Sequence, residues 1–412
     1  MQPPHRELVV SLMVTVCWAA SSRPVRAQDD DPKSRHRRTA PAAASLRLET
    51  LTRQGTRYLA DLEDGGRAEL TLSPRLQEAA EDVFRAFEVP YGAAVVVSIA
   101  DGRVLALAGR AAAARDLGPE ELALRPWAPA ASVFKIVSAA ALVSAGGIRA
   151  TTKTCYHGGL SAVMPDNLID VPRLDRRCDT LAYGLGKSQN AILAKLASRH
   201  LTVEALEQAG AAFGFGRAIP FDLPVEPSEL DVPREPLEFA RTAAGFWHST
   251  LSPLHGALMA AAIANDGKMP APRLVARAWT ADGRRTPSTD TPAPSRRVVD
   301  ARTAREVGRM MELTTTMGTA KATFRDRGGR RYLPVEVAGK TGSLARKGDA
   351  GYLGYSWFVG YAPAARPQIA FAVALGNPDA WKIKAAYVAR RLVAEYLADG
   401  GDRSAARLLA AR

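Results

Sequence analysis

The chain has 412 residues, 47% of them hydrophobic, and a formal net charge of +13 at pH 7. It is therefore long enough to bury a substantial core as one large domain or two subdomains, and a basic protein of this kind is attracted to anionic wall or membrane polymers. Nucleic acid is excluded as the expected partner, because no basic helix and no basic patch with interleaved aromatic residues accompanies the charge.

The first residues predict export from the cytoplasm. A basic start at Arg6 precedes a mainly apolar run over residues 8–20, which is followed by the small-x-Ala cleavage pattern Val25-Arg-Ala27. So short a run does not span a bilayer comfortably. We therefore expect residues 1–27 to be a cleaved signal peptide, with an uncleaved membrane anchor as the alternative. The mature protein is then periplasmic or secreted, and residues 28–45 are expected to be a flexible linker.

Residues 46–90 are expected to lead into the main domain, which we place at 91–400. Two short strands are predicted around the turn Asp64-Gly-Gly66. Ser73, as an N-cap followed by a proline, then opens a helix that is expected to run through Phe87.

The main domain is expected to begin with a hairpin and to end with a sheet and a helix. The expected elements are a hairpin over 93–99 and 104–108, a largely helical stretch over about 132–263 that the proline-rich segment 220–236 interrupts, a helix over 300–317 capped by Asp300, three strands near Val335, Trp357 and Ile369, and a closing helix over 381–397. Strands from both ends can form one antiparallel sheet flanked by the terminal helices, with the helical insert as a second lobe. The predicted fold class is therefore α/β of the α+β kind, with a cleft between the lobes.

Three short motifs occur once each and in one order: Ser132-Val-Phe-Lys135, Ser188-Gln-Asn190 and Lys340-Thr-Gly342. Each motif alone is weak, since a serine at a helix start is usually a cap and an isolated lysine usually lies at the surface. Together they supply a serine nucleophile, a base to activate it and a cation to hold an acyl donor. The set therefore predicts an acyl-transfer enzyme.

Ser132 and Lys135 have the spacing of a nucleophile and its base. Three residues apart at the start of a predicted helix, they lie one turn apart on the same face. The helix N-terminus offers Ser132 an unpaired backbone N–H, which favours a developing oxyanion. Lys135 can act as a base only when neutral, and burial together with a second cation lowers the pKa of a lysine. Lys340 is the expected second cation.

The remaining motif residues complete the expected site. Ser188, bridging the two lysines, is expected to relay a proton to the leaving amine, and Asn190 to hold an amide of the substrate. The third motif lies in a strand predicted over 335–343, whose edge can pair with an extended peptide, and Gly342 leaves room for that approach. The N–H of Ser343 is expected to be a second oxyanion donor beside that of the nucleophile.

The content and order of these motifs resemble the transpeptidase domain of penicillin-binding proteins, among the penicillin-recognising serine acyltransferases. Residues 251–270 are similar to the family's helix after the active-site loops, and Met317-Gly-Thr-Ala320 with 337–343 to its approach to the third motif. Ser356-Trp-Phe-Val-Gly-Tyr-Ala-Pro363 resembles the strand that follows. The resemblance covers about residues 75–400 and implies a β-lactamase- or transpeptidase-like fold.

The resemblance also implies an activity and a role for each motif residue. The implied roles are Ser132 as nucleophile, Lys135 as base, Ser188 and Asn190 as proton relay and substrate contact, and Lys340, Thr341 and Ser343 as ligands of the substrate carboxylate and oxyanion. The implied donor is a peptidoglycan stem peptide ending in D-alanyl-D-alanine, and β-lactam antibiotics are implied as covalent inhibitors. A separate glycosyltransferase is the expected protein partner, and no cofactor or metal is expected.

The sequence leaves several functions open beside that of a D,D-transpeptidase. A D,D-carboxypeptidase would resolve the Ser132 ester with water, a serine β-lactamase would hydrolyse a penicillin ester quickly, and a sensor or scaffold would acylate slowly without turnover. Glu226 and Glu229 lie in a loop that superficially resembles the deacylating loop of some β-lactamases. Their spacing differs, and we interpret both as exposed loop residues. We therefore expect a long-lived ester.

Two cysteines remain after removal of the signal peptide, which carries Cys17. Cys155 and Cys178 are one candidate pair for a disulfide in an oxidising compartment. A metal site that uses both cysteines and His157 is the alternative, although it lacks a visible fourth ligand.

Overall fold

The computed structural model describes residues 46–112, 118, 120–286, 294–348, 351–378 and 382–400. All of them fall within Ala44–Arg412, the larger of the two units into which the chain divides. The signal peptide predicted over 1–27 and the linker predicted over 28–45 lie outside the described residues, so both stay predictions. Within the described part of the chain, no helix is both long and apolar enough to cross a membrane.

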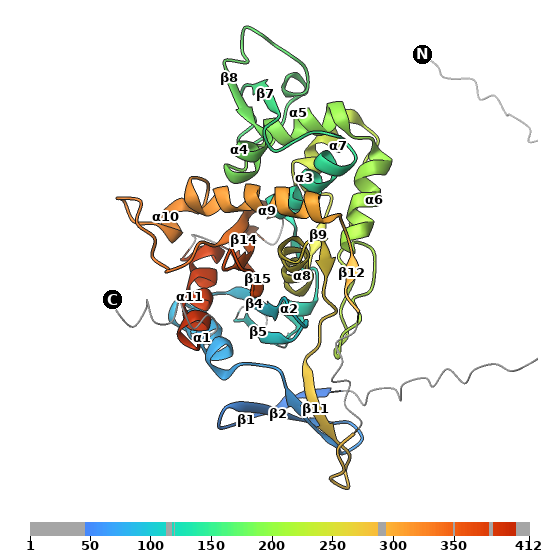
Figure 1. Ribbon diagram of the computed structural model, residues 1–412, viewed down its shortest axis with the longest axis vertical. Helices are drawn as coiled ribbons and strands as arrows, with labels where there is room; N and C mark the ends of the chain where they lie inside the picture. The colour runs from blue at the N-terminus through green and yellow to red at the C-terminus, as the bar shows by residue number, and fades with distance from the viewer. Residues whose placement is uncertain are drawn as a thin grey trace, which may run out of the picture. The chain divides into compact units, whose positions relative to one another are not determined.

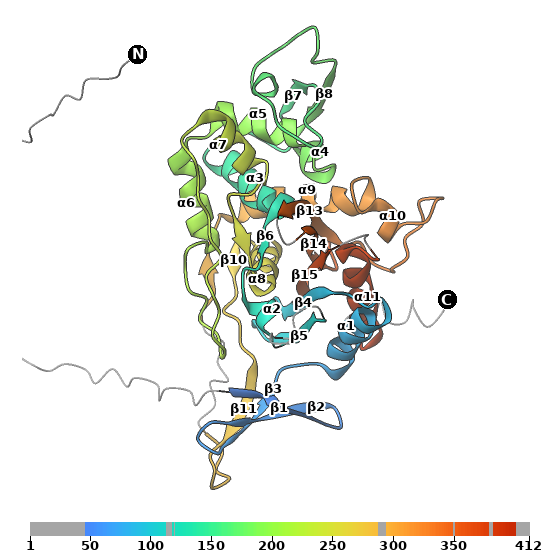
Figure 2. The same cartoon turned by 180° about the vertical axis from the view of Figure 1, so that it is seen from behind.

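The central element is a five-stranded antiparallel sheet with the strand order β13-β14-β15-β4-β5 (Figure 1; β13 is labelled in Figure 2). Its strands are β4 (Tyr91–Ser98), β5 (Val104–Ala111), β13 (Ala338–Gly348), β14 (Gly351–Ala362) and β15 (Ile369–Asn377). β15 pairs directly with β4, so strands from opposite ends of the domain lie side by side. This confirms the prediction of one antiparallel sheet built from both ends.

Helices cover both faces of this sheet. α1 (Pro74–Ala86) and α11 (Ala385–Ala398) lie side by side in both views (Figures 1 and 2). They share an apolar core with alternate residues of β4, Ala94 and Val96, while Ala93, Val95 and Val97 belong to the core on the opposite face. This alternation is the period of a strand. α8 (Pro253–Ala264) lies on that opposite face and is buried on all sides, as a helix between a sheet and a second lobe must be.

The second lobe is helical, as predicted. It contains the 3-10 turn η1 (Ala131–Phe134), α3 (Lys135–Ser144), α4 (Leu181–Gly186), α5 (Asn190–His200), α6 (Val203–Phe213) and α7 (Pro236–Ala243). α9 (Ala301–Thr316) contacts α3, α4 and β13 and so joins the lobe to the sheet. Asp300 caps α9 as predicted, since its carboxylate accepts a hydrogen bond from the N–H of Thr303.

Short elements connect these parts. They are α2 (Glu121–Leu124), α10 (Lys321–Phe324), η2 (Pro165–Asn167), and the strand pairs β6 (Ala128–Pro129) with β9 (Thr250–Leu251), β7 (Lys153–Tyr156) with β8 (Arg177–Thr180) and β10 (Lys268–Met269) with β12 (Arg296–Arg297).

A second, smaller sheet has the strand order β1-β2-β3-β11. β1 (Leu46–Gln54), β2 (Arg57–Leu62) and β3 (Arg67–Leu70) form an antiparallel meander, and β11 (Val275–Trp279) joins it from a distant part of the chain. The two strands predicted around the turn at Asp64-Gly-Gly66 are present as β2 and β3, but the prediction missed β1. A second turn at Gly55, in the left-handed region with φ 60°, divides the segment once more, and glycine adopts that conformation without steric cost.

The structure also corrects several predicted boundaries. Ser73 occupies the N-cap of α1, but its side chain accepts no hydrogen bond there. The strand predicted from Val335 begins at Ala338, and the helix predicted from residue 381 begins at Ala385. The predicted helical stretch also contains the β7–β8 pair. Local sequence patterns mark the ends of an element less sharply than the element itself, because tertiary context overrides local preference there.

Cys155 and Cys178 are joined by a disulfide between β7 and β8, where the two residues are register partners. Because the two sulfurs are bonded to each other, neither is free to ligate a metal as a thiolate. His157 instead has its Nδ1 2.6 Å from a carboxylate oxygen of Asp175.

The double variant Cys155→Ala/Cys178→Ala is expected to lose about 3 kcal/mol of unfolding free energy, because the bond closes a loop in the unfolded chain. Denaturant unfolding without reductant measures the loss, and peptide mapping without reduction locates the bond. As a control, reductant should bring the wild type and the variant to the same midpoint. Stoichiometric reaction of maleimide with the native, unreduced wild type would contradict the disulfide.

Candidate active site

Ser132 and Lys135 meet at the junction of η1 and α3. Lys135 Nζ lies 2.7 Å from Ser132 Oγ, so the side chains are in hydrogen-bonding contact across one turn. Lys135 is fully buried. The first residues of the predicted helix form a 3-10 turn, and the α-helix starts only at Lys135. The spacing of three brings nucleophile and base together in this geometry too.

The backbone before the nucleophile is strained. Ala131 has φ 49°, a conformation that is uncommon for a residue with a Cβ. Gly245 lies against this turn, and a Cβ on it would come within 2.4 Å of the carbonyl oxygen of Ala131. The turn that carries Ser132 is therefore held by close backbone packing. Strain that surrounding structure maintains is common at active sites.

Ser188 lies between the two motif lysines. Its Oγ accepts a hydrogen bond from Lys340 Nζ at 2.9 Å and lies 3.4 Å from Lys135 Nζ. Ser188 also has a positive φ, 56°. The side chain of Asn190, the first residue of α5, accepts from Lys135 Nζ through Oδ1 at 2.6 Å and donates through Nδ2 to the carbonyl oxygen of Leu160 at 2.8 Å. In this structure, then, Asn190 holds the base.

Both lysines are fully buried, and this changes their titration. Burial lowers the pKa of Lys135 well below its usual value, and the charge of Lys340 lowers it further. Burial also lowers the pKa of Lys340, to about 7. Burial and a neighbouring charge both lower the pKa of Lys135, whereas burial alone lowers that of Lys340. Lys135 therefore loses its proton at a lower pH than Lys340 does. A substrate carboxylate beside Lys340 raises the pKa of that lysine and so keeps it charged.

The third motif lies on the edge strand β13. Lys340 Nζ donates to the carbonyl oxygen of Thr341 at 2.8 Å, and the hydroxyls of Thr341 and Thr319 are 2.6 Å apart. Gly342 is buried, and a Cβ on it would lie 3.0 Å from Trp357 Cβ and 3.2 Å from Val133 Cγ2. Its small size thus serves the contact between β13 and η1. We predicted that Gly342 leaves room for a substrate. In the structure that space is occupied by atoms of Trp357 and Val133, so the prediction was wrong.

Several of these groups line a pocket of about 720 Å³ between the two lobes, whereas Lys135, Lys340 and Gly342 are not among its lining residues. Among the predicted residues that line it are Ser132, Ser188, Asn190, Thr341 and Ser343. None of the described lining residues is an aspartate or a glutamate. Glu226 instead pairs with Arg125 at 2.7 Å, and neither Glu226 nor Glu229 is among the lining residues.

Sequence reasoning missed part of the pocket wall. Thr319 lines the pocket and contacts Thr341, although the segment that contains it was singled out as the approach to the third motif. Phe246 and Trp247 also line the pocket. No periodic pattern marks these two residues, because they lie in a loop after α7. A loop next to the turn of the nucleophile can be found only from the fold.

A family model, curated relatives and solved structures can each be compared with this chain. The model for the penicillin-binding protein transpeptidase domain matches residues 92–394, more than half of the chain. The peptidoglycan D,D-transpeptidase PbpA of Mycobacterium tuberculosis is 27% identical over 350 residues, covering 76% of this chain and 68% of its own length. Stage V sporulation protein D of Bacillus subtilis is 27% identical over 254 residues, covering 60% and 38%.

Solved structures show the same fold. The penicillin G acyl-enzyme complex of penicillin-binding protein A from M. tuberculosis has a TM-score of 0.66 at 23% identity, covering 81% of both chains. A D,D-transpeptidase domain from Eggerthella lenta has a TM-score of 0.67 at 24% identity, covering 87% of this chain and 92% of that one. At this identity the likeness is evidence of fold alone. With the family match over residues 92–394, the chain belongs to the penicillin-binding protein transpeptidase domain family.

Proposed function

We propose that this protein is a serine D,D-transpeptidase that cross-links peptidoglycan through an ester on Ser132. The observation that carries the proposal is the buried lysine base, Lys135, whose Nζ lies 2.7 Å from Ser132 Oγ. A serine with an adjacent neutral base is an activated nucleophile. The pocket around it and the cation Lys340 provide the space and the charge for an acyl donor with a terminal carboxylate.

The acylation step follows from these contacts. Neutral Lys135 accepts the proton of the Ser132 hydroxyl while Oγ attacks the carbonyl carbon of the D-Ala-D-Ala bond. Ser188, which lies between both lysines, relays this proton from Lys135 to the departing nitrogen as the C–N bond breaks, and Lys135 is neutral again. D-alanine leaves as a free amine, and the rest of the donor remains as an ester. The N–H groups of Ser132 and Ser343 are the proposed oxyanion donors.

The same geometry supports the recognition of the leaving D-alanine. Its carboxylate would lie against Lys340 and the paired hydroxyls of Thr341 and Thr319, which are 2.6 Å apart. An acceptor amine then attacks the ester carbonyl and forms the amide cross-link, the bond from the carbonyl carbon to Ser132 Oγ breaks, and Lys135 moves the proton of the amine to Oγ. We assign this activity to residues 91–400 and place the protein in the periplasm or outside the cell. A separate glycosyltransferase would supply its glycan strands.

The ester with penicillin is expected to persist for minutes or longer. Deacylation by water needs a positioned base, and no described carboxylate lines the pocket. Intact-mass spectrometry over time should show the addition of one drug mass that decays slowly, while D-Ala-D-Ala peptides release D-alanine. Supplying an acceptor amine together with the donor peptide should give a cross-linked product. Release of D-alanine without such a product would make the protein a carboxypeptidase.

Glu226→Gln is the matched control for this prediction. Glu226 pairs with Arg125 outside the pocket, so the variant should form and lose the adduct at the rates of the wild type. Rapid turnover of a chromogenic cephalosporin that disappears in Glu226→Gln would instead show a β-lactamase. Slow acylation with no release of D-alanine from any donor peptide would indicate a sensor.

A further inference from the structure

An ion pair that the acylation chemistry does not use lies close to the disulfide. Lys195 Nζ is 2.8 Å from Asp175 Oδ2, and the side chains of Lys195 and Asp175 are 0% and 4% exposed. Burial alone would raise the pKa of Asp175, but hydrogen bonds from His157 and Lys195 hold it below its usual value. Burying two charges is costly, and such a pair is weak evidence for stability. A role in holding specific groups in place is the alternative.

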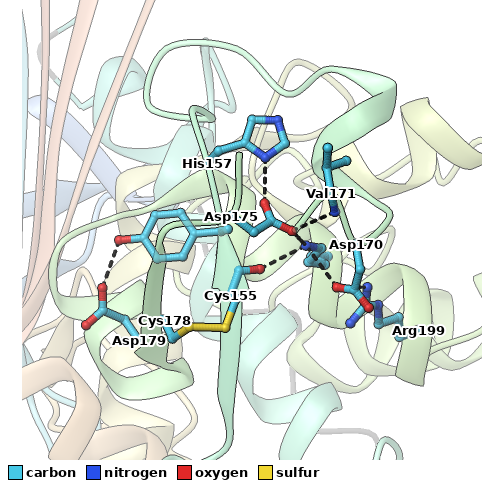
Figure 3. The surroundings of a disulfide bond; sticks show 10 residues. Cys155, His157, Asp170, Val171, Asp175, Cys178, Asp179 and Arg199 are labelled. Atoms are coloured by element: carbon cyan, nitrogen blue, oxygen red, sulfur yellow. Dashed lines mark hydrogen bonds and ion pairs between the residues drawn. A yellow bond between two sulfur atoms is a disulfide. The ribbon is translucent and has the colours of Figure 1, made fainter. Parts of the chain in front are cut away.

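The pair fastens the segment that follows β7 onto α5. Lys195, on α5, donates a second hydrogen bond to the carbonyl oxygen of Cys155 at 2.8 Å. Asp175 receives the N–H of Val171 at 3.0 Å and lies 2.6 Å from His157 Nδ1. Figure 3 shows His157 and Val171 converging on this one carboxylate, beside the Cys155–Cys178 bond. Both ends of the segment that leaves Cys155 and returns to Asp175 are thus tied to one helix.

This segment reaches the active site three residues after His157. The carbonyl oxygen of Leu160 accepts a hydrogen bond from Asn190 Nδ2 at 2.8 Å. Just before it, Gly159 lies so close to α5 that a Cβ on it would be 2.4 Å from the Cβ of Ala191. The segment therefore lies against the first turn of the helix that also carries Lys195. Asn190 and Lys195 are five positions apart on this helix, which corresponds to a rise of about 7.5 Å along its axis.

The Leu160 carbonyl determines which way the Asn190 amide faces. An amide has one donor end and one acceptor end. With Nδ2 donating to Leu160, Oδ1 must face Lys135 Nζ, from which it is 2.6 Å away. Without that carbonyl, the amide can turn its NH₂ group toward Lys135, and the neutral amine of Lys135 would then accept from it with the lone pair that has to take the proton of Ser132. The base would lose the acceptor that aims its lone pair at Ser132.

We propose that Lys195 and Asp175 are positioning residues for acylation, which hold the segment of Leu160 on α5 and thereby orient the Asn190 amide toward Lys135. The pair touches neither substrate nor the reacting atoms, and acts only through Asn190. This inference rests on the proposed acyl-transfer function. It predicts that the effects of Asp175 and Asn190 on acylation are not independent, since both act on the same contact with Lys135.

A double-mutant cycle of Asp175→Asn and Asn190→Ala tests the proposal. The measured quantities are the rate constant of acylation by penicillin at saturation and the concentration for half-saturation. Asp175→Asn is expected to lower the rate constant by about 10²-fold with little change in half-saturation, because misplacing a reacting group by about 1 Å has an effect of that size. In the Asn190→Ala background it should lower the rate no further.

Two further variants separate positioning from stability. The double charge variant Asp175→Leu/Lys195→Met removes both buried charges. Its melting temperature is expected to return to that of the wild type, whereas its acylation rate is expected to stay as low as that of Asp175→Asn. Arg199→Ala, on the same helix, removes an exposed pair with Asp170, which keeps its contact with Lys195 Nζ at 3.3 Å, and should acylate like the wild type. The proposal would be overturned if Asp175→Asn lowered the acylation rate constant by the same factor in the wild type and in Asn190→Ala. It would also be overturned if the double charge variant were acylated at the rate of the wild type. If the double charge variant does not fold, the double-mutant cycle of Asp175→Asn and Asn190→Ala tests the proposal by itself. A wild type that is never acylated would overturn the proposed function and this inference with it.

Discussion

Ser132→Ala is expected to form no covalent adduct with penicillin. The variant lacks the hydroxyl that lies nearer to the buried base, since Lys135 Nζ is 2.7 Å from Ser132 Oγ and 3.4 Å from Ser188 Oγ. The pocket, Lys340 and the Thr341–Thr319 pair remain in place, so penicillin can still bind reversibly. Intact mass should therefore show a drug adduct on the wild type and none on the variant. Peptide mapping of the wild type should locate the adduct on the peptide that contains Ser132.

Ser144→Ala is the matched control for this experiment. Ser144 lies on α3 and donates its hydroxyl to the carbonyl oxygen of Ala140 within the helix, away from the pocket-lining residues. It should be acylated at the rate of the wild type. A drug adduct that survives in Ser132→Ala would reject Ser132 as the nucleophile, and mapping would then test Ser188, the nearest other hydroxyl to Lys135 in the site.

Replacing Lys135 should lower acylation by about 10²- to 10⁴-fold, the usual effect of losing a general base. Lys135→Met is preferable to alanine, because Lys135 is fully buried and a shorter side chain would leave a cavity. Stopped-flow acylation measures the rate, and thermal unfolding shows that the variant folds. Near wild-type acylation in a folded Lys135→Met would mean that another group takes the proton of Ser132.

The pH profile of the wild type gives an independent check on the two lysines. Acylation needs Lys135 neutral and Lys340 charged, so the rate at low penicillin concentration should rise with pH as Lys135 loses its proton and fall as Lys340 does. Burial places the pKa of Lys340 at about 7, which puts the falling limb near neutral pH in the free protein. At saturation this limb should move to higher pH, because a bound carboxylate raises the pKa of Lys340.

Lys340→Met tests the coupling between the lysines. The charge of Lys340 lowers the pKa of Lys135, so its removal should raise that pKa and move the rising limb to higher pH. The falling limb should disappear. A rising limb that does not move would show that the two ammonium groups do not interact. Penicillin should also bind less tightly, since the partner of its carboxylate is gone.

Local patterns in the sequence were sufficient for the fold class and for the residues of the three motifs. Alternating and helical periodicities depend on neighbours within a few positions. They therefore predicted the α9 helix with its Asp300 cap, the β4–β5 hairpin and the order of sheet, helical lobe and sheet, all of which the structure contains. The motifs could be recognised because each keeps its chemistry within four residues.

Only the tertiary structure decided what each side chain contacts. Lys340 reaches Ser188 across 152 positions of sequence, and Asn190 is held by Leu160, a residue with no motif of its own. The positive φ of Ala131 and Ser188 and the packing of Gly342 against Val133 likewise have no local signal. These features come from contacts between segments far apart in the chain, and strain of this kind persists only where the surrounding fold maintains it. The sequence therefore determined which groups were available for acyl transfer, and the packing of one lobe against the other determined how they are aimed.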